Sequence, residues 1–121
     1  MYFLEGFLAT IFSFIGYRRF LNKRYQDAIR FYEKALKYKS DDDIKRTIFL
    51  SLGRCYVAIE EYDQAVNIMS SAYELISQNY DNVTDAILKR EYRSFFKAYS
   101  YALGKIGKND ISKKITEEWQ L

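Results

Sequence analysis

We predict an all-α fold of stacked antiparallel helix hairpins from two features of the sequence. The first is composition: the 121 residues include no proline and only five glycines, while long stretches consist of alanine, leucine, isoleucine, lysine, glutamate and arginine, which suit helices. The second is a two-helix pattern that occurs twice along the chain. A chain of this length forms one domain with one continuous core, so we treat residues 1–121 as a single unit.

The two-helix pattern is clearest in the segments YQDAIRFYEKAL and YDQAVNIMSSAY. An offset of 37 residues places Ala28 over Ala65 and also Gly16 over Gly53. In both units the glycine lies on a first helix, and the alanine follows twelve residues later on a second helix. Because glycine has no side chain, we expect the two helices of each unit to touch backbone to backbone at this point.

These residues resemble the tetratricopeptide repeat (TPR) family. The family signature has an aromatic residue, Leu-Gly and Tyr on the first helix and Ala-x-x-x-Phe on the second. The second unit matches it closely at Phe49, Leu52, Gly53, Tyr56, Ala65 and Met69. The first unit is similar at Phe12, Ile15, Gly16, Ala28 and Tyr32, but has Arg19 where the family has an aromatic residue. The resemblance implies a short right-handed superhelix whose first helices line a concave groove.

A third unit is fainter. It places Phe96, Tyr99, Ser100 and Leu103 on a first helix and Ser112 on a second. This unit begins ten residues later than the 37-residue offset predicts, so we expect a loop at Asn79 to Asn82 and an extra turn or two in the next helix. The expected units are residues 8–40, residues 45–78, and residues 84–119 as a divergent repeat or capping helices.

Local signals predict where helices begin and end. Ser40 or an aspartate of the run DDD is expected to cap one helix, and the segment NVTDA is expected to cap the next. The segment GKND indicates a helix end followed by a new start.

The composition argues against an enzyme. There is no histidine and a single cysteine, so a Ser-His or Cys-His pair, a histidine ligand and a cysteine cluster are all excluded. No phosphate-binding loop is present, and we expect no catalytic residue, metal or cofactor. Cys55 is expected to be a small buried core residue, and nothing indicates an oxidising compartment. We therefore expect a cytoplasmic protein.

Charge is mixed along the chain. The net charge of +3 arises from 19 basic and 16 acidic residues, without the single-sign field that nucleic-acid binders concentrate on one face. We therefore do not expect a nucleic-acid partner. RNA or an acidic lipid surface would become plausible if folding brought Arg90, Arg93 and Lys97 beside Arg54.

The resemblance to the repeat family also suggests a function, a non-catalytic adaptor, scaffold or chaperone-like module that binds a peptide or helix in its groove. The implied groove residues are Tyr17, Phe20, Leu50, Arg54, Lys97 and Tyr101. For Phe20 the alternative is a place in the core. The aromatic and cationic character of this set suits a partner with apolar anchors and an acidic group.

The segment MYFLEGFLATIFSFIGY is apolar on nearly every side. We expect it to pack on the first hairpin through Leu4, Phe7, Leu8, Ile11, Phe12 and Ile15. Residues Tyr2, Phe3, Phe7 and Phe14 are the candidates for self-association into a homodimer or for binding a partner helix. The alternative is a membrane-associated assembly or regulatory factor, anchored at the cytoplasmic face by this helix and by Arg18 and Arg19. The apolar run is shorter than the roughly 20 residues that a membrane span needs.

Overall fold

The computed structural model describes residues 2–121, and this range is helical apart from short connections. In chain order the elements are α1 (Tyr2–Leu21), α2 (Tyr25–Leu36), α3 (Asp42–Ala58), α4 (Tyr62–Ser77), the short 3-10 helix η1 (Tyr80–Asn82), α5 (Ala86–Lys105) and α6 (Asn109–Trp119). The predicted all-α class is confirmed.

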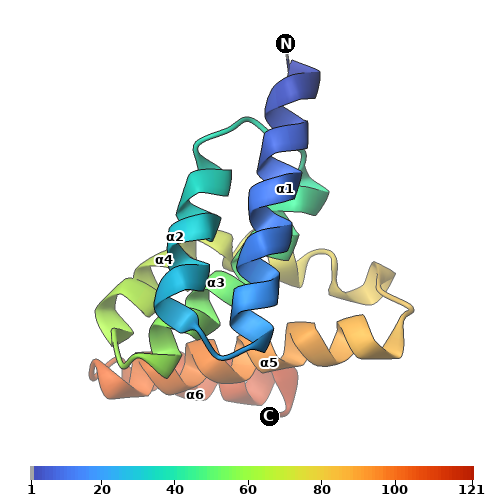
Figure 1. Ribbon diagram of the computed structural model, residues 1–121. Coiled ribbons are helices and arrows are strands. Elements are labelled where there is room, and N and C mark those ends of the chain that lie inside the picture. Colours follow the sequence, from blue (N-terminus) through green and yellow to red (C-terminus); the bar gives the residue numbers. More distant parts are fainter. Residues whose placement is uncertain (1) are drawn as a thin grey trace.

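Neighbouring α-helices of the chain pack as three hairpins, α1 with α2, α3 with α4, and α5 with α6. Helix α3 is central, because it also contacts α1, α2 and α5. In Figure 1, α1 and α2 lie side by side, while α5 and α6 run crosswise beneath them. Each hairpin thus stacks on the next, and the direction of the helices changes along the stack. The first hairpin begins at Tyr2, before the predicted start at residue 8.

The turn inside each hairpin has the same backbone geometry. Its central residue is left-handed in all three cases, at Lys23 (φ 61°), Glu60 (φ 62°) and Gly107 (φ 84°). The next residue donates its N–H to a carbonyl five residues earlier, and this bond is 2.9 Å long in every turn. Such bonds satisfy the last carbonyls of a helix. The third hairpin therefore closes like the other two, although it follows an inserted connection that contains η1.

A recurring contact also joins the two helices of each hairpin. It links residues that are sixteen apart: Gly16 with Tyr32, Gly53 with Met69, and Ser100 with Thr116. A Cβ atom added to Gly16 would lie 3.0 Å from the Tyr32 ring, and one added to Gly53 would lie 2.3 Å from Cγ of Met69. In the third hairpin two hydroxyl oxygens meet at 2.7 Å instead. The expected backbone-to-backbone contact is thus wrong in detail, since each glycine makes room for a side chain of the opposite helix.

The packed face of α1 also differs from the predicted one. Of the stripe Leu4, Phe7, Leu8, Ile11, Phe12 and Ile15, the side chains of Leu4, Phe7 and Ile11 are exposed. Ala9, Ser13 and Gly16 are buried in their place. These small residues allow α1 to lie close to α2, and the bulky residues are therefore displaced to the outer face of the helix.

Two predicted helix caps are confirmed. The Asp41 carboxylate accepts a hydrogen bond from the backbone N–H of Ile44 at 3.0 Å, at the start of α3. The Asp85 carboxylate accepts one from Leu88 at 2.9 Å, at the start of α5. Gly107 separates α5 from α6, as the segment GKND predicts.

An aromatic cluster fixes α6 to the rest of the fold. The Trp119 ring stacks on Phe96 with a centroid distance of 3.9 Å and lies edge-on to Tyr80 at 5.1 Å. Its Nε1–H donates to the Tyr73 hydroxyl at 2.7 Å. The outer side of α6 is polar, with exposed Asp110, Lys113, Lys114, Glu117 and Glu118. The stack thus ends in a helix with one apolar and one solvated side.

Candidate functional site

The first helices of the three hairpins enclose a small apolar hollow of about 160 Å³. It is lined by Tyr17 of α1, Thr47, Leu50 and Ser51 of α3, and Leu88 and Glu91 of α5. Leu50 and Ser51 are buried, whereas the Leu88 side chain is 41 % exposed. The hollow therefore has a closed floor and an accessible apolar wall, which is the usual form of a side-chain binding pocket.

Arg54 lies beside this hollow and links α3 to α5. Its Nη1 is 2.5 Å from a carboxylate oxygen of Glu91, and both side chains are largely buried. Its guanidinium also lies 4.7 Å from the ring centroid of Phe20 on α1. A cation between a carboxylate and an aromatic face is well stabilised. Arg54 therefore holds the three first helices in position, and its charge is already balanced by Glu91.

The predicted groove residues fall into two groups. Tyr17 and Leu50 line the hollow, and Phe20 and Arg54 lie next to it, with the Tyr17 and Phe20 ring centroids 6.2 Å apart. Lys97 is exposed and does not line the hollow. Tyr101 is also outside it, and its ring packs against Tyr62 of α4 at 5.8 Å.

Thr47, Ser51, Leu88 and Glu91 are lining residues that the sequence reasoning did not select. Leu88 and Glu91 lie in the first two turns of α5, ahead of the stretch that aligns with the other repeats. Because α5 runs crosswise to α1 (Figure 1), its beginning lies at the hollow. The available signal was the ten-residue shift of the third unit, which predicts an extra turn or two in this helix.

No known protein family, curated protein or solved structure matches this chain. The case for a function therefore rests on the molecule's own surfaces.

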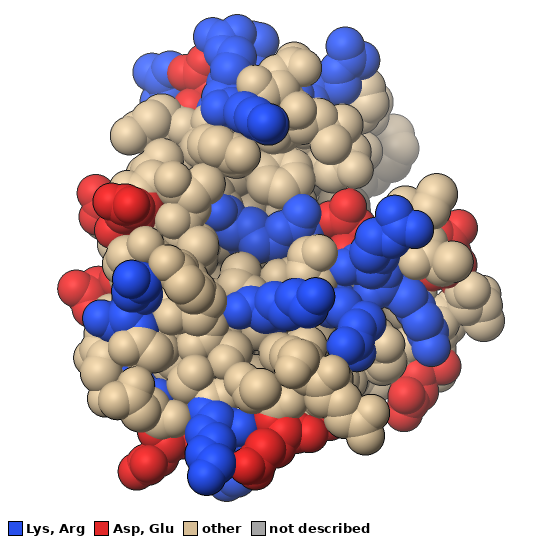
Figure 2. Space-filling view, turned by 90° about the horizontal axis from the view of Figure 1, so that it is seen from below, with Lys and Arg blue, Asp and Glu red and all other residues tan. Residues whose placement is uncertain are grey.

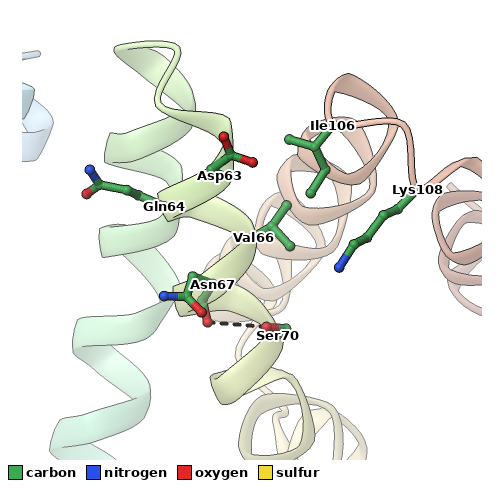
Figure 3. Close-up of a pocket in the computed structure, with 7 residues that line it drawn as sticks. All are labelled: Asp63, Gln64, Val66, Asn67, Ser70, Ile106 and Lys108. Atoms are coloured by element: carbon green, nitrogen blue, oxygen red, sulfur yellow. Dashed lines mark hydrogen bonds between the residues drawn. The ribbon is translucent and has the colours of Figure 1, made fainter.

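A second, larger hollow of about 550 Å³ lies between α4 and the turn that joins α5 to α6. Figure 3 shows its lining residues: Asp63, Gln64, Val66, Asn67, Ser70, Ile106 and Lys108. Most of these are solvent-exposed polar side chains on one side of α4. The dashed bond in Figure 3 runs from the Ser70 hydroxyl to the Asn67 carbonyl within that helix. The lining of this hollow is about evenly polar and apolar, whereas that of the smaller hollow is mostly apolar, so the smaller one is the better candidate for an apolar side chain.

Basic side chains gather on the face seen from below in Figure 2, with acidic groups mostly toward its edges. On helix α5, Arg90 and Lys97 are exposed. Arg93 donates hydrogen bonds to the carbonyls of Trp119 and Gln120, at 3.1 and 3.3 Å. The charge of Arg54 is balanced by Glu91 within the fold.

The outer face of α1 carries the other predicted residues. Phe3, Phe7 and Phe14 are exposed, Phe3 by 86 % and Phe14 by 62 %. The side chain of Tyr2, the fourth member of that set, lies outside the described part of the structure. Among the helices of residues 2–121, none combines the length and apolar character that crossing a bilayer requires.

Cys55 is buried in the core, as predicted. Burial raises the pKa of its thiol from 9.0 to about 12, and burial also raises the pKa of the Tyr32 and Tyr56 phenols. The unfolded chain loses these protons from about pH 9 upward, while the folded chain retains them. Stability is therefore full below about pH 9 and falls as the pH rises toward 12, by up to about 1.4 kcal/mol per pH unit for each group.

This alkaline loss can be measured by urea unfolding between about pH 8 and pH 11. Cys55→Ala is the control, because it removes the thiol and should make the loss shallower while the tyrosine part remains. A free energy of unfolding that stays constant over this range would contradict the expectation.

Proposed function

We propose that this protein is a non-catalytic, cytoplasmic interaction module, TPR-like in architecture, that binds a peptide or a helix in the groove between α1, α3 and α5. The observation that carries the proposal is the apolar hollow to which all three first helices contribute. The shared turn geometry and the sixteen-residue contact of the three hairpins support the TPR-like assignment.

The size of the hollow indicates the kind of anchor. A cavity of about 150 Å³ holds one benzene ring, so 160 Å³ accommodates a single aromatic or branched side chain. Leu50 and Leu88 supply the apolar contact, and the carboxylate of Glu91 lies at the hollow as an acceptor for a ligand N–H. Because Glu91 already balances Arg54, the apolar anchor is the main determinant and an acidic group in the ligand becomes secondary.

The test uses a phage-displayed library of short random peptides, selected on the purified wild-type protein. Peptides with a common aromatic or branched anchor are expected, and their binding should weaken at least tenfold in Leu88→Arg, which fills the hollow with a charged chain. The control is Ile87→Arg, since Ile87 is the adjacent residue, is 68 % exposed and does not line the hollow. Peptides that bind both variants equally well would show that the groove is not the site.

A further inference from the structure

Helix α1 carries an exposed apolar seam with the spacing of a coiled coil. Leu4, Phe7, Ile11, Phe14, Arg18 and Leu21 occupy alternate steps of three and four residues, and all six are exposed. In a coiled-coil heptad, Leu4, Ile11 and Arg18 would be a positions, and Phe7, Phe14 and Leu21 would be d positions. Arg18 is the one charged residue among the six. We call these six residues the α1 seam.

The rest of the fold leaves the α1 seam unobstructed. Ala9 and Gly16, which are seven residues apart on the opposite side of α1, are buried, and Gly16 faces the Tyr32 ring of α2. The positions that flank the seam include Phe3, Thr10, Tyr17, Leu8 and Ile15, and none of these is charged. A second helix that lies along the seam therefore meets no like charge at its edges.

We propose that the α1 seam joins two copies of this chain into an antiparallel homodimer. In the register that matches every a position with a d position, Leu4 faces Leu21 of the second copy, Phe7 faces Arg18, and Ile11 faces Phe14. The two-fold axis then passes between Ile11 and Phe14, and the same contacts occur twice. This inference is independent of the groove.

Charge decides the orientation. In a parallel pair Arg18 would face Arg18 of the second copy across the seam, and two like charges would be brought together. In the antiparallel pair each Arg18 lies over a phenylalanine ring, an arrangement that it already makes with Phe14 of its own helix at 6.0 Å. The acidic end of α1, at Glu5, also comes near the basic end at Arg18 and Arg19, in line with the two helix dipoles.

The surface that the α1 seam would bury is large enough for a specific dimer. A buried aromatic side chain covers about 150–250 Å², so the exposed parts of the seam and Phe3 amount to roughly 600 Å² per chain, or roughly 1,200 Å² for two copies, the lower limit of stable interfaces. Such an area suits a dimer that dissociates on dilution.

Sedimentation of the wild-type chain tests the dimer. The mass is expected to rise from 14.4 kDa toward twice that value at high micromolar concentration. Phe14→Glu places a charge at the centre of the seam and should weaken the dimer at least tenfold, while Ile87→Glu, at an equally exposed site on α5, should leave it unchanged. A wild-type chain that remains monomeric, or equal effects of the two variants, would overturn the proposal.

Cysteine cross-linking tests the orientation. Leu4 and Leu21 are exposed, and the natural Cys55 is buried. A mixture of Leu4→Cys and Leu21→Cys chains should form a disulfide-linked dimer, whereas neither variant alone should, because about 25 Å of helix separates the two positions. Self-linked Leu4→Cys dimers would exclude the antiparallel register.

A lipid surface is the competing use of this face. Flotation with phosphatidylcholine and phosphatidylglycerol vesicles distinguishes lipid binding from dimerisation. If monomeric wild-type protein floats with the vesicles and Phe14→Glu does not, the face binds lipid and the dimer proposal fails. No flotation together with concentration-dependent sedimentation supports the dimer.

Discussion

Replacement of Trp119 with alanine is expected to lower the free energy of unfolding by about 3 kcal/mol, the loss typical of a large aromatic side chain that leaves a cavity. The Trp119 ring stacks on Phe96 and lies edge-on to Tyr80, and its Nε1–H donates to the Tyr73 hydroxyl. These contacts join α6 and η1 to α4 and α5. Their removal should therefore loosen the whole end of the stack. Urea unfolding followed by far-ultraviolet circular dichroism measures the change.

Two further variants separate the contributions of Trp119. Trp119→Phe retains the stacking but loses the hydrogen bond, and about 1 kcal/mol is expected for that bond. Ile111→Ala, at an exposed site on the same helix, should change the stability by less than about 0.5 kcal/mol. If Trp119→Ala lowered the free energy of unfolding no more than Ile111→Ala does, the aromatic cluster would not be what holds α6 in place.

Replacement of Gly53 with leucine is expected to be about as damaging, at about 3 kcal/mol, because it overpacks the core. Even a single Cβ atom at this position would lie 2.3 Å from Cγ of Met69. The contact cannot be relieved by moving only the end of the Met69 side chain, since Cγ lies close to its backbone. Thermal unfolding of the variant should show a clearly lower midpoint.

Gly6→Ala is the matched control for Gly53. Gly6 also lies within a helix, but an added Cβ would meet nothing within 4 Å. Alanine favours helix over glycine by about 0.5–1 kcal/mol, so this variant should be slightly more stable than wild type. If both glycine variants raised stability, helix propensity and not packing would govern these positions.

The two-hairpin repeat is predictable from the sequence because its contacts are local. The spacing from Gly16 to Ala28 recurs from Gly53 to Ala65, and the fainter third unit forms a hairpin that closes with the same turn at Gly107. The caps at Asp41 and Asp85 are predictable for the same reason, since each involves only residues three apart.

The candidate site was only partly predictable. Tyr17 and Leu50 follow from the repeat positions, but Leu88 and Glu91 enter the hollow only because α5 crosses α1. The connection through η1 that leads into α5 has no counterpart in the other units. The pairing of Arg54 with Glu91 is likewise a contact between separate helices, and the type of Arg54 alone could not distinguish a ligand-binding cation from a structural one.

The face of α1 was misassigned for a different reason. The segment is apolar around most of its circumference, so the spacing of large residues did not select a side. The packed side is instead the one with the smallest side chains, since Ala9, Ser13 and Gly16 are the residues that are buried. In such a helix the positions of small residues are a better guide to the packed face than those of large ones.

The solvated outer side of α6 would limit how far the proposed association through α1 can proceed. One end of the stack is an apolar helix, and the other presents exposed Asp110, Lys113, Lys114, Glu117 and Glu118. A head-to-tail contact between these unlike ends would leave charges against an apolar surface, and repetition of such a contact would give a fibre. A contact of α1 with α1 is closed by its own symmetry. If α1 pairs as proposed, growth would therefore stop at a pair, because the charged side of α6 disfavours the head-to-tail contact that a filament needs.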